Sequence, residues 1–574
     1  MSKLLSTIIT ILLTGICALI YYLALPALTI HSAGFWCFLV ICLVCLSISI
    51  TCFCSDDFGK VVGASWIITI AFLLFFGGFG LASSMLFHSD EAQQVADVTE
   101  SDRLIVEDFP DITAEDSFNN LPLVDLDTAN MLGDKKVAQL KHASWYDVDD
   151  EYNLIQYQGK YYRLSVIDYG GYWKYKKAKH DGLPGYVLVS ATSRNGIVTQ
   201  EAVVKQLDEA IRYSPGAFKS HDLRRHLRSQ YPFYIFDESY MEIDEEGAPY
   251  WITGVLRPTV GLFGVKTVTS FIVTSAQTGD SQEYPIGDAP EWIDHIFSLT
   301  YLMNIAEWHY SYIGGFWNNA FGKTDVWRTS YYFRDKHQIS AGSEAGKFAN
   351  FFGYSSIIQD GQVMYYAGLT TANKADSNLG WLIIDTSSGK MTQYRFKNEK
   401  GEDASGAEES SAQVAAEQLV QSMNYEATFP LPVNIAGEPS YIMCLKGKAG
   451  LIQAYAVCNI DNYSICVQAE TLDKALNQYL EKLGKDAVYD TTEDTDDDGQ
   501  NPAAEALEIT GKVVEIYTAE VNGTTQFYYV IGNELYRSSI KLNELQVTWK
   551  VGDELTVAFY EDGALRVVTD IKKN

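Results

Sequence analysis

Three long apolar stretches fill the first ninety residues, and they limit how this chain can fold more than any other feature. No Asp, Glu, Lys or Arg lies between Lys3 and Asp56, and none lies between Lys60 and Asp90. A helix needs about 20 apolar residues to cross the hydrocarbon core of a membrane. Three stretches reach or approach that length: residues 4–25, 35–53 and 61–87. The sequence therefore predicts a membrane anchor of three transmembrane helices within residues 1–88.

A cleaved secretory signal peptide is the alternative for the first stretch. Such a peptide has a shorter apolar core and an A-x-A-like cleavage site. The first stretch lacks a clear site of this kind, and two more apolar stretches follow it directly. We therefore expect all three helices to be retained in a multi-pass membrane protein.

Two lysines carry the signal for orientation. Lys3 precedes the first stretch and Lys60 lies between the second and the third. The loop between the first two stretches has no Lys or Arg, and neither do the 15 residues after the third. Short loops rich in Lys and Arg stay in the cytoplasm. This predicts a cell-membrane protein whose large C-terminal part is extracytoplasmic.

The chain is strongly acidic, which restricts its partners. Its 574 residues carry a formal net charge of −30. Nucleic acids bind proteins mainly through basic surfaces, so we expect no nucleic-acid partner. The sequence also contains no H-E-x-x-H, no G-x-S-x-G and no P-loop, which leaves metalloprotease, serine-hydrolase and nucleotide-binding chemistry without support. We therefore predict that the protein is not an enzyme.

One pattern occurs four times between residues 105 and 484. Each copy has a Gly near a turn, a short aromatic strand, an apolar strand, a tight turn and a polar strand, and the copies begin at Gln158, Glu246, Asp360 and Gly437. Helical patterns precede or follow most copies: Glu201–Arg212, Phe218–Ser229, Ser411–Met423 and Thr471–Leu483. A helix packed on an antiparallel meander is a sensible α+β unit. The predicted repeats are residues 89–215, 216–335, 336–400 and 401–484.

The last ninety residues have a different composition. Residues 485–505 form an acidic linker that is poor in apolar residues. Five short β patterns follow within residues 506–574, and Asn522-Gly523 and Asp562-Gly563 are hairpin turns. Five strands in about 65 residues favour a small β-barrel similar to the oligonucleotide/oligosaccharide-binding (OB) type. The predicted fold class is thus α+β, with three transmembrane helices, four helix-plus-meander repeats and an OB-like β-barrel.

The linker contains a candidate calcium site. Its residues match the calcium-loop pattern D-x-[DN]-x-[DN]-G-x₅-E at Asp494, Asp496, Asp498 and Glu505. These carboxylates could bind Ca²⁺ weakly, as extracellular modules do. The alternative is an acidic linker that fits the pattern because it is full of Asp.

A basic and aromatic loop is the first candidate binding surface. Residues 170–182 contain Tyr172, Trp173, Lys174, Tyr175, Lys176, Lys177 and Lys179. Such a surface could bind lipid headgroups, an anionic wall polymer or an acidic protein. The alternative is a hairpin tip that lysines keep soluble. A second basic patch surrounds Arg224, Arg225 and Arg228, where a solvated helix face is the favoured interpretation.

Two further candidates leave alternatives open. Residues 291–322 are rich in aromatic side chains, including Trp308 and Trp317. They could form a binding surface, since Trp and Tyr are good contact residues, or part of a core. Cys458 and Cys466 flank a predicted hairpin turn of the fourth copy. They could pair across strands outside the cell, or remain two buried thiols.

Parts of the chain resemble known bacterial proteins. The hairpin Ile383–Tyr394 is similar to the PepSY and cystatin-like modules of envelope proteins. Four stretches resemble a set of uncharacterised membrane-anchored envelope proteins of Gram-positive gut bacteria: LPLVDLDTA, LRRHLRSQYP, EIDEEGAPYWI and FPLPVNIAGEPSYIMCL. The resemblance implies a fold and a location, but no activity.

These observations together favour a non-catalytic function. We expect a membrane-anchored, extracytoplasmic binding or scaffold protein of the cell envelope, with a protein or wall-polymer partner. One alternative is an envelope glycan or peptide hydrolase that uses paired carboxylates. Another is an accessory subunit of a membrane protein complex.

Overall fold

The computed structural model describes most of the chain. The described residues are 3–53, 59–101, 109, 111–113, 121–149, 152–194, 197–198, 200–330, 353–372, 377–397, 402–487, 507–521, 524–532, 534–562 and 565–573. The chain divides into two compact units, Met1–Tyr489 and Asp490–Asn574. The first unit contains the apolar helices and a large α+β region, which we call the head.

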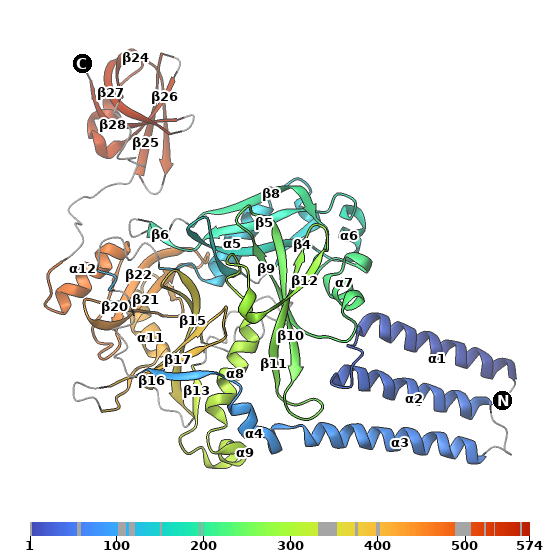
Figure 1. Ribbon diagram of the computed structural model, residues 1–574. Helices are drawn as coiled ribbons and strands as arrows, with labels where there is room; N and C mark the ends of the chain where they lie inside the picture. The colour runs from blue at the N-terminus through green and yellow to red at the C-terminus, as the bar shows by residue number, and fades with distance from the viewer. Residues whose placement is uncertain are drawn as a thin grey trace. The chain divides into compact units, whose positions relative to one another are not determined.

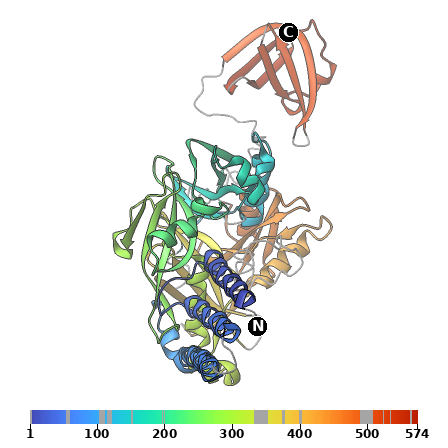
Figure 2. The same cartoon turned by 90° about the vertical axis from the view of Figure 1, so that its right-hand side faces the viewer.

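Three long helices lie where the sequence predicts the membrane spans. They are α1 (Lys3–Ala24), α2 (Ala33–Phe53) and α3 (Gly59–Ala82), and each is long and apolar enough to cross a membrane. Figures 1 and 2 show them side by side. Most of their apolar side chains are exposed, as expected for helices that face lipid. Lys3 and Lys60 lie at the helix ends far from the head, whereas the turn between α1 and α2 lies against it (Figure 1).

The head contains four antiparallel sheets, which confirms the predicted α+β class. The first contains β2 (Tyr146–Val148), β3 (Asn153–Tyr157), β4 (Lys160–Tyr169), β5 (Leu183–Ser190) and β8 (Ala202–Ile211). The second contains β9 (Ile235–Ile243), β10 (Pro249–Pro258), β11 (Lys266–Ser275) and β12 (Ser281–Pro285). A separate pair joins β6 (Ser193–Arg194) to β7 (Ile197–Val198).

The other two sheets follow in the chain. The third contains β13 (Trp327–Thr329), β14 (Ser355–Gln359), β15 (Gln362–Thr371), β16 (Ser377–Asp385), β17 (Met391–Arg395) and β18 (Gly406–Ala407), and β1 (Val98–Ser101) adds a parallel edge strand. The fourth contains β19 (Glu426–Ala427), β20 (Leu431–Ile435), β21 (Glu438–Lys446), β22 (Ile452–Asn459) and β23 (Cys466–Ala469). Each sheet holds one of the four sequence copies.

Three of the four sheets contain the same tight hairpin. Its two turn residues both have positive φ, as in Gln158-Gly159 (51° and 71°) and Asp360-Gly361 (51° and 80°). This is the type I′ turn, whose twist matches that of the flanking strands. Ala436-Gly437 repeats it between β20 and β21. The turn explains why a Gly precedes each of these aromatic strands.

Helices pack on or between the sheets. They are α5 (Leu126–Val137), α7 (Leu223–Gln230), α8 (Leu299–Ser311), α11 (Glu409–Leu419) and α12 (Leu472–Lys482). Three of the four helices predicted near the copies are present, but the predicted helix Glu201–Arg212 is wrong. Those residues form the edge strand β8, which pairs with β5. Their apolar spacing fits a helix, yet the backbone groups along β5 need hydrogen-bond partners.

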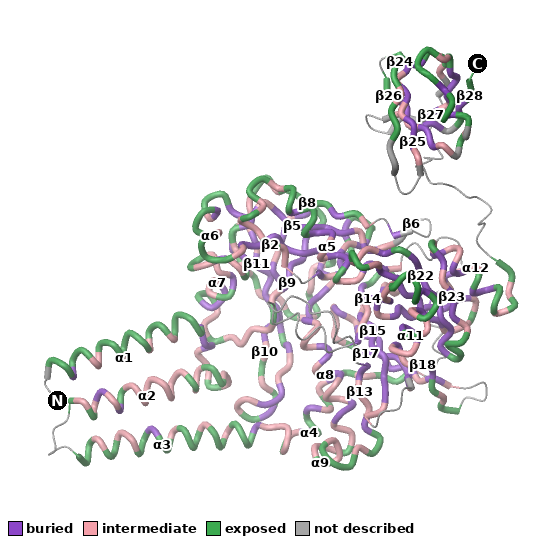
Figure 3. The backbone as a smooth tube through the Cα atoms, turned by 180° about the vertical axis from the view of Figure 1, so that it is seen from behind, coloured by how far each residue is buried: buried purple, intermediate pink, exposed green. Residues whose placement is uncertain are grey.

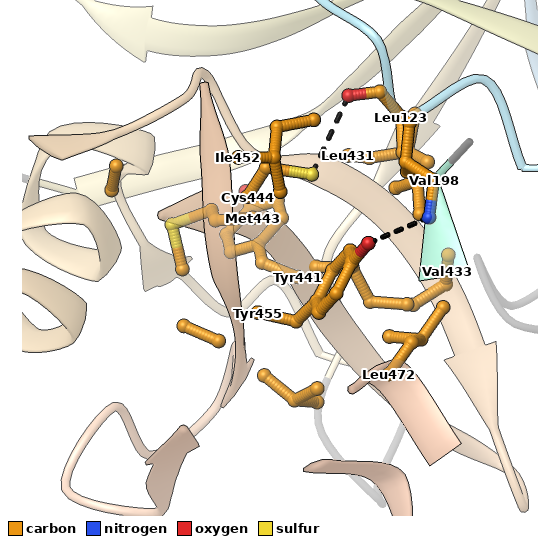
Figure 4. Close-up of a cluster of buried hydrophobic side chains, with 14 of the residues drawn as sticks. Leu123, Val198, Leu431, Val433, Tyr441, Met443, Cys444, Ile452, Tyr455 and Leu472 are labelled. Atoms are coloured by element: carbon orange, nitrogen blue, oxygen red, sulfur yellow. Dashed lines mark hydrogen bonds between the residues drawn. The ribbon is translucent and has the colours of Figure 1, made fainter. Parts of the chain in front are cut away.

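The sheets share hydrophobic cores. Buried side chains of α8 lie between the second and third sheets, and Tyr186 packs with Trp251 between the first and second. The largest cluster joins the fourth sheet to segments near the first sheet (Figure 4). There the Val198 N–H donates to the Tyr455 hydroxyl at 2.8 Å. The four sheets therefore form one folded body.

A disulfide answers the question that the sequence left open about two cysteines. Cys458 on β22 and Cys466 on β23 face each other across the strand pair and are bonded. Both are buried.

The second unit consists of β24 (Leu507–Val521), β25 (Thr524–Ile531), β26 (Glu534–Ser539), β27 (Glu554–Asp562) and β28 (Leu565–Lys573). All five predicted strands are present. Each strand pairs with two others in the order β24-β25-β26-β28-β27, so the sheet closes on itself. Tyr529, Leu555 and Val557 are fully buried inside it.

Candidate membrane-facing surface

Helix α7 lies where the head meets the membrane helices. Asp222 begins it, because its side chain accepts a hydrogen bond from the Arg225 N–H at 2.7 Å. Leu223 and Leu227, four residues apart, point into the head core. The three arginines of the helix lie on other faces and are left to contact the membrane helices.

These arginines bind the end of α1. Pro26 has no N–H, so the Tyr22 carbonyl cannot make its usual helical hydrogen bond. Arg225 Nη1 donates to that carbonyl at 2.9 Å, and its guanidinium lies 3.9 Å from the centre of the Tyr22 ring. Arg224 Nη2 donates to the Ala24 carbonyl at 3.1 Å. Cations at a helix C-terminus are also favoured by the helix dipole.

Arg228 is the buried member of the group. Its Nε donates to the Leu25 carbonyl at 3.2 Å, and its Nη1 donates to the Tyr234 carbonyl at 2.5 Å. The guanidinium also lies 4.5 Å from the Phe236 ring. Burial lowers the pKa of Arg228 to about 10, so it stays charged at neutral pH. We call Arg224, Arg225 and Arg228 the arginine clamp.

A second contact holds the other two membrane helices. The Leu262 N–H donates to Ser83 Oγ at 3.2 Å, just after α3. The Leu262 carbonyl lies 3.1 Å from Nδ1 of His31, just before α2. Phe263 packs edge-on against Trp36. The head is therefore joined to all three membrane helices.

The predicted basic and aromatic loop forms a helix and not a hairpin tip. In α6 (Tyr172–Ala178), Tyr175 is buried and its hydroxyl lies 3.3 Å from Nδ1 of His221. Phe218 packs on both Tyr172 and Tyr175. These contacts fix α6 beside the segment that leads into α7. Tyr175, a predicted binding residue, thus belongs to the core.

The other predicted residues of α6 remain accessible. Trp173 is 72% exposed and Tyr172 is 39% exposed. Lys176 and Lys177 are exposed, and Lys176 Nζ lies 5.6 Å from the centre of the Trp173 ring. Lys174 pairs with Asp147 at 3.7 Å. The basic-aromatic surface comprises Tyr172, Trp173, Lys174, Lys176, Lys177, Lys179, Arg224 and Arg225.

The structure brings the two basic patches of the sequence together. Figures 1 and 3 show α6 and α7 beside each other, at the end of the head from which α1 leaves. Trp308 and Trp317 do not join them. Trp308 packs at the edge of the α8 core, and Trp317 is 63% exposed and stacks on Phe321 at 5.8 Å.

A cavity of about 850 Å³ lies beside the arginine clamp. Its lining comes both from the turn after α1, including Leu25 and Pro26, and from head residues such as Asp149, Phe236 and Asp237. Burial raises the pKa of Asp237 to about 6, although Ser298 Oγ donates a hydrogen bond to it at 2.8 Å. Charged and apolar groups therefore meet at this cavity.

Another buried polar pair lies deeper in the head. Oε1 of Glu242 on β9 lies 2.8 Å from Nδ1 of His295, and both side chains are almost fully buried. Burial raises the pKa of Glu242 well above its ordinary value and lowers that of His295 to about 4. Burial therefore favours the neutral form of both groups, which share one hydrogen bond.

The metal prediction has no structural test. Asp494, Asp496, Asp498 and Glu505 lie outside the described residues. Within the parts of the chain that the structure describes, no group of three or more His, Cys, Asp or Glu side chains could hold a metal ion.

Sequence reasoning missed the arginine clamp, although two signals were present. Pro26 directly follows the first apolar stretch and leaves carbonyls without donors. One short helix carries three arginines, and their guanidinium groups need hydrogen-bond acceptors: Arg224, Arg225 and Arg228. What the sequence could not show is that residues 200 positions apart meet.

No protein-family model matches the chain, and no curated protein matches it. The fold and the site define a chain with three candidate membrane helices joined to a large α+β head.

Proposed function

We propose that this is a membrane-anchored, extracytoplasmic binding or scaffold protein of the cell envelope, without catalytic activity. The observation that carries the proposal is the joint between head and anchor. The arginine clamp and the Leu262 contacts attach the head to all three membrane helices. Such a joint presents a large surface at a fixed orientation, which suits a scaffold.

Two observations support an extracytoplasmic head. Lys3 and Lys60 lie at the opposite ends of the helices from the head, and short basic segments favour the cytoplasm. The arginine clamp lies about 140 residues after the third span, within a long domain, so it does not enter that rule. The Cys458–Cys466 disulfide fits an oxidising compartment.

The repeat and barrel assignments belong to the same proposal. In each sheet, four strands pair antiparallel as a meander. They are consecutive in the second, third and fourth sheets, and in the first they are β3, β4, β5 and β8. This supports four copies of one unit. The pairing of β26 with β28 is parallel, while the other pairs of the ring are antiparallel. We take the C-terminal unit as an OB-like barrel that serves for protein contact, and the similarity to Gram-positive envelope proteins as a guide to location.

One observation favours the envelope hydrolase as a second candidate. Asp149 and Asp237 come from different segments and line the same cavity. The raised pKa of Asp237, about 6, suits a general acid. A hydrolase would release soluble fragments from purified cell-wall glycan or peptide, and Asp237→Asn would stop that release.

Cross-linking in native membranes tests the scaffold proposal. A membrane-impermeant cross-linker is added to intact spheroplasts, and the full chain is then purified in detergent. We expect the same envelope protein or wall polymer to be recovered repeatedly. Recovery of one membrane protein complex in fixed stoichiometry would instead identify an accessory subunit. Absence of any partner, together with release of wall fragments, would overturn the scaffold proposal in favour of the hydrolase.

A further inference from the structure

The basic-aromatic surface is continuous with the end of a membrane helix. Phe218 connects the Tyr172 ring of α6 to the segment before α7, and Arg225 of α7 contacts Tyr22 of α1. Views from opposite sides place α6 and α7 together where α1 leaves the head (Figures 1 and 3). The surface therefore lies at the level where α1 emerges from the hydrocarbon core.

The charge of this surface is opposite to that of the whole chain. Residues 171–180 and 216–231 together contain eight Lys or Arg residues and one Asp, against a net charge of −30 overall. The Asp is Asp222, which caps α7. Asp147 neutralises Lys174 in part, and Asp181 follows the first segment. A clear positive excess remains.

The side chains also suit the membrane interface. Trp and Tyr favour the headgroup level of a bilayer, where one side of the ring is apolar and the other is wet. Trp173 is the most exposed aromatic side chain of α6, and the lysine stems beside it can lie along the surface while their amines reach phosphates. The exposure of Trp173 is costly in water and favourable at an interface.

We propose that the basic-aromatic surface binds the anionic phospholipid headgroups of the membrane that α1, α2 and α3 span. The inference rests on the proposed membrane anchorage and deepens it by naming what this face of the head binds. The bilayer is the partner because the anchor fixes the surface beside it. A wall polymer or an acidic protein would have to displace the adjacent headgroups.

Photo-cross-linking in the full chain tests this directly. Benzoylphenylalanine replaces Trp173, and the purified protein is reconstituted into nanodiscs of phosphatidylglycerol and phosphatidylcholine, or of phosphatidylcholine alone. We expect lipid adducts at position 173 in the mixed nanodiscs and few in phosphatidylcholine. The same probe at Tyr463, which is exposed in the turn between β22 and β23, should give none.

Charge variants supply the matched comparison. Each Lys near an anionic bilayer contributes about fivefold to binding, so Lys176→Gln with Lys177→Gln should reduce the adducts by about tenfold or more. Lys135→Gln with Lys136→Gln, an exposed pair on α5, should leave them unchanged. All four lysines are exposed, and equal thermal midpoints would show that both variants fold.

The outcomes separate this inference from the proposed function. Equal adducts in phosphatidylcholine alone, no lipid adducts, or adducts in native membranes to a protein or polymer in place of lipid would each overturn it. The scaffold proposal is tested separately, by the partner that the cross-linker recovers from spheroplasts, and these lipid results do not decide it.

Discussion

At the scale of single residues, burial decides what an arginine of the clamp contributes. Arg224 is exposed and makes one hydrogen bond to α1, whereas Arg228 is buried and satisfies carbonyls of both α1 and the head. A buried guanidinium needs such partners, because an unpaired buried charge is strongly destabilising. Arg228 therefore links α1 to the head from a buried position, and Arg224 remains available to solvent or lipid.

The Glu242–His295 pair predicts how stability depends on pH. Burial raises the pKa of Glu242 well above its ordinary value, so we expect the folded pair to keep one proton, on Glu242, at neutral pH. In the unfolded chain Glu loses its proton near 4.5 and His near 6.5. Between pH 4.5 and pH 6.5 the pair therefore holds one proton in both the folded and the unfolded chain. Above 6.5, and up to the raised pKa of Glu242, only the folded state does, so the contribution of this pair to the free energy of unfolding falls by about 1.4 kcal/mol per pH unit.

Glu242→Gln should remove this fall, because the amide can still donate to His295 and does not titrate. The urea midpoint of the variant, followed upward from pH 6.5, should decline less steeply than that of the wild type. Glu246→Gln, in the turn between β9 and β10, should keep the wild-type slope. A Glu242→Gln variant with an unchanged slope would show that the pair does not hold a proton.

At the scale of elements, some glycines lie where a neighbouring strand leaves no space for a Cβ atom. Gly185 on β5 and Gly380 on β16 occupy corresponding places at the start of the apolar strand. A Cβ at either one would collide with a backbone carbonyl of the neighbouring strand, that of Lys205 or Tyr394. Gly361 differs, since its φ is +80° but a Cβ there would meet open space. At Gly185 and Gly380 glycine is needed because the backbone of the next strand lies too close for a Cβ atom. At Gly361 it is needed only because the backbone has a positive φ.

These two reasons for a glycine predict different losses of stability when it is replaced by alanine. Gly380→Ala should lower the free energy of unfolding by roughly 3 kcal/mol, because the strand pair must separate to admit the methyl group. Gly361→Ala should cost about 1 kcal/mol, the strain of a positive φ. Denaturant unfolding of the full chain measures both. Equal effects of the two substitutions would contradict the assignment of Gly380 to close packing.

Local patterns predicted the elements better than the long-range contacts. The apolar spans, the tight turns, α11, α12 and the five C-terminal strands all follow from hydropathy and turn residues. β8 does not, because Val204, Leu207 and Ile211 have helical spacing and only the open edge of β5 makes them a strand. Likewise the sequence marked two basic patches, but their union at the end of α1 depends on tertiary packing.

At the scale of the whole molecule, the disulfide and the membrane helices predict the same side of the membrane for the head. The head follows three candidate spans, an odd number, so we expect it to lie across the membrane from Lys3. The lysine positions predict that Lys3 lies in the cytoplasm, and a disulfide persists where thiols are not kept reduced. These two arguments are independent, since one concerns insertion and the other concerns redox chemistry.

The redox state of three cysteines in living cells should therefore reveal the side on which the head folds. Cells are quenched with a thiol-blocking reagent in denaturant, then reduced and treated with a second, heavier reagent. Peptide mass spectrometry should find the heavy label on Cys458 and Cys466 and the light label on Cys444, which is buried but free. Cys444 controls for access, because it shares their fold and becomes reachable only on denaturation. Light label on all three would place the head in the reducing cytoplasm and overturn the topology.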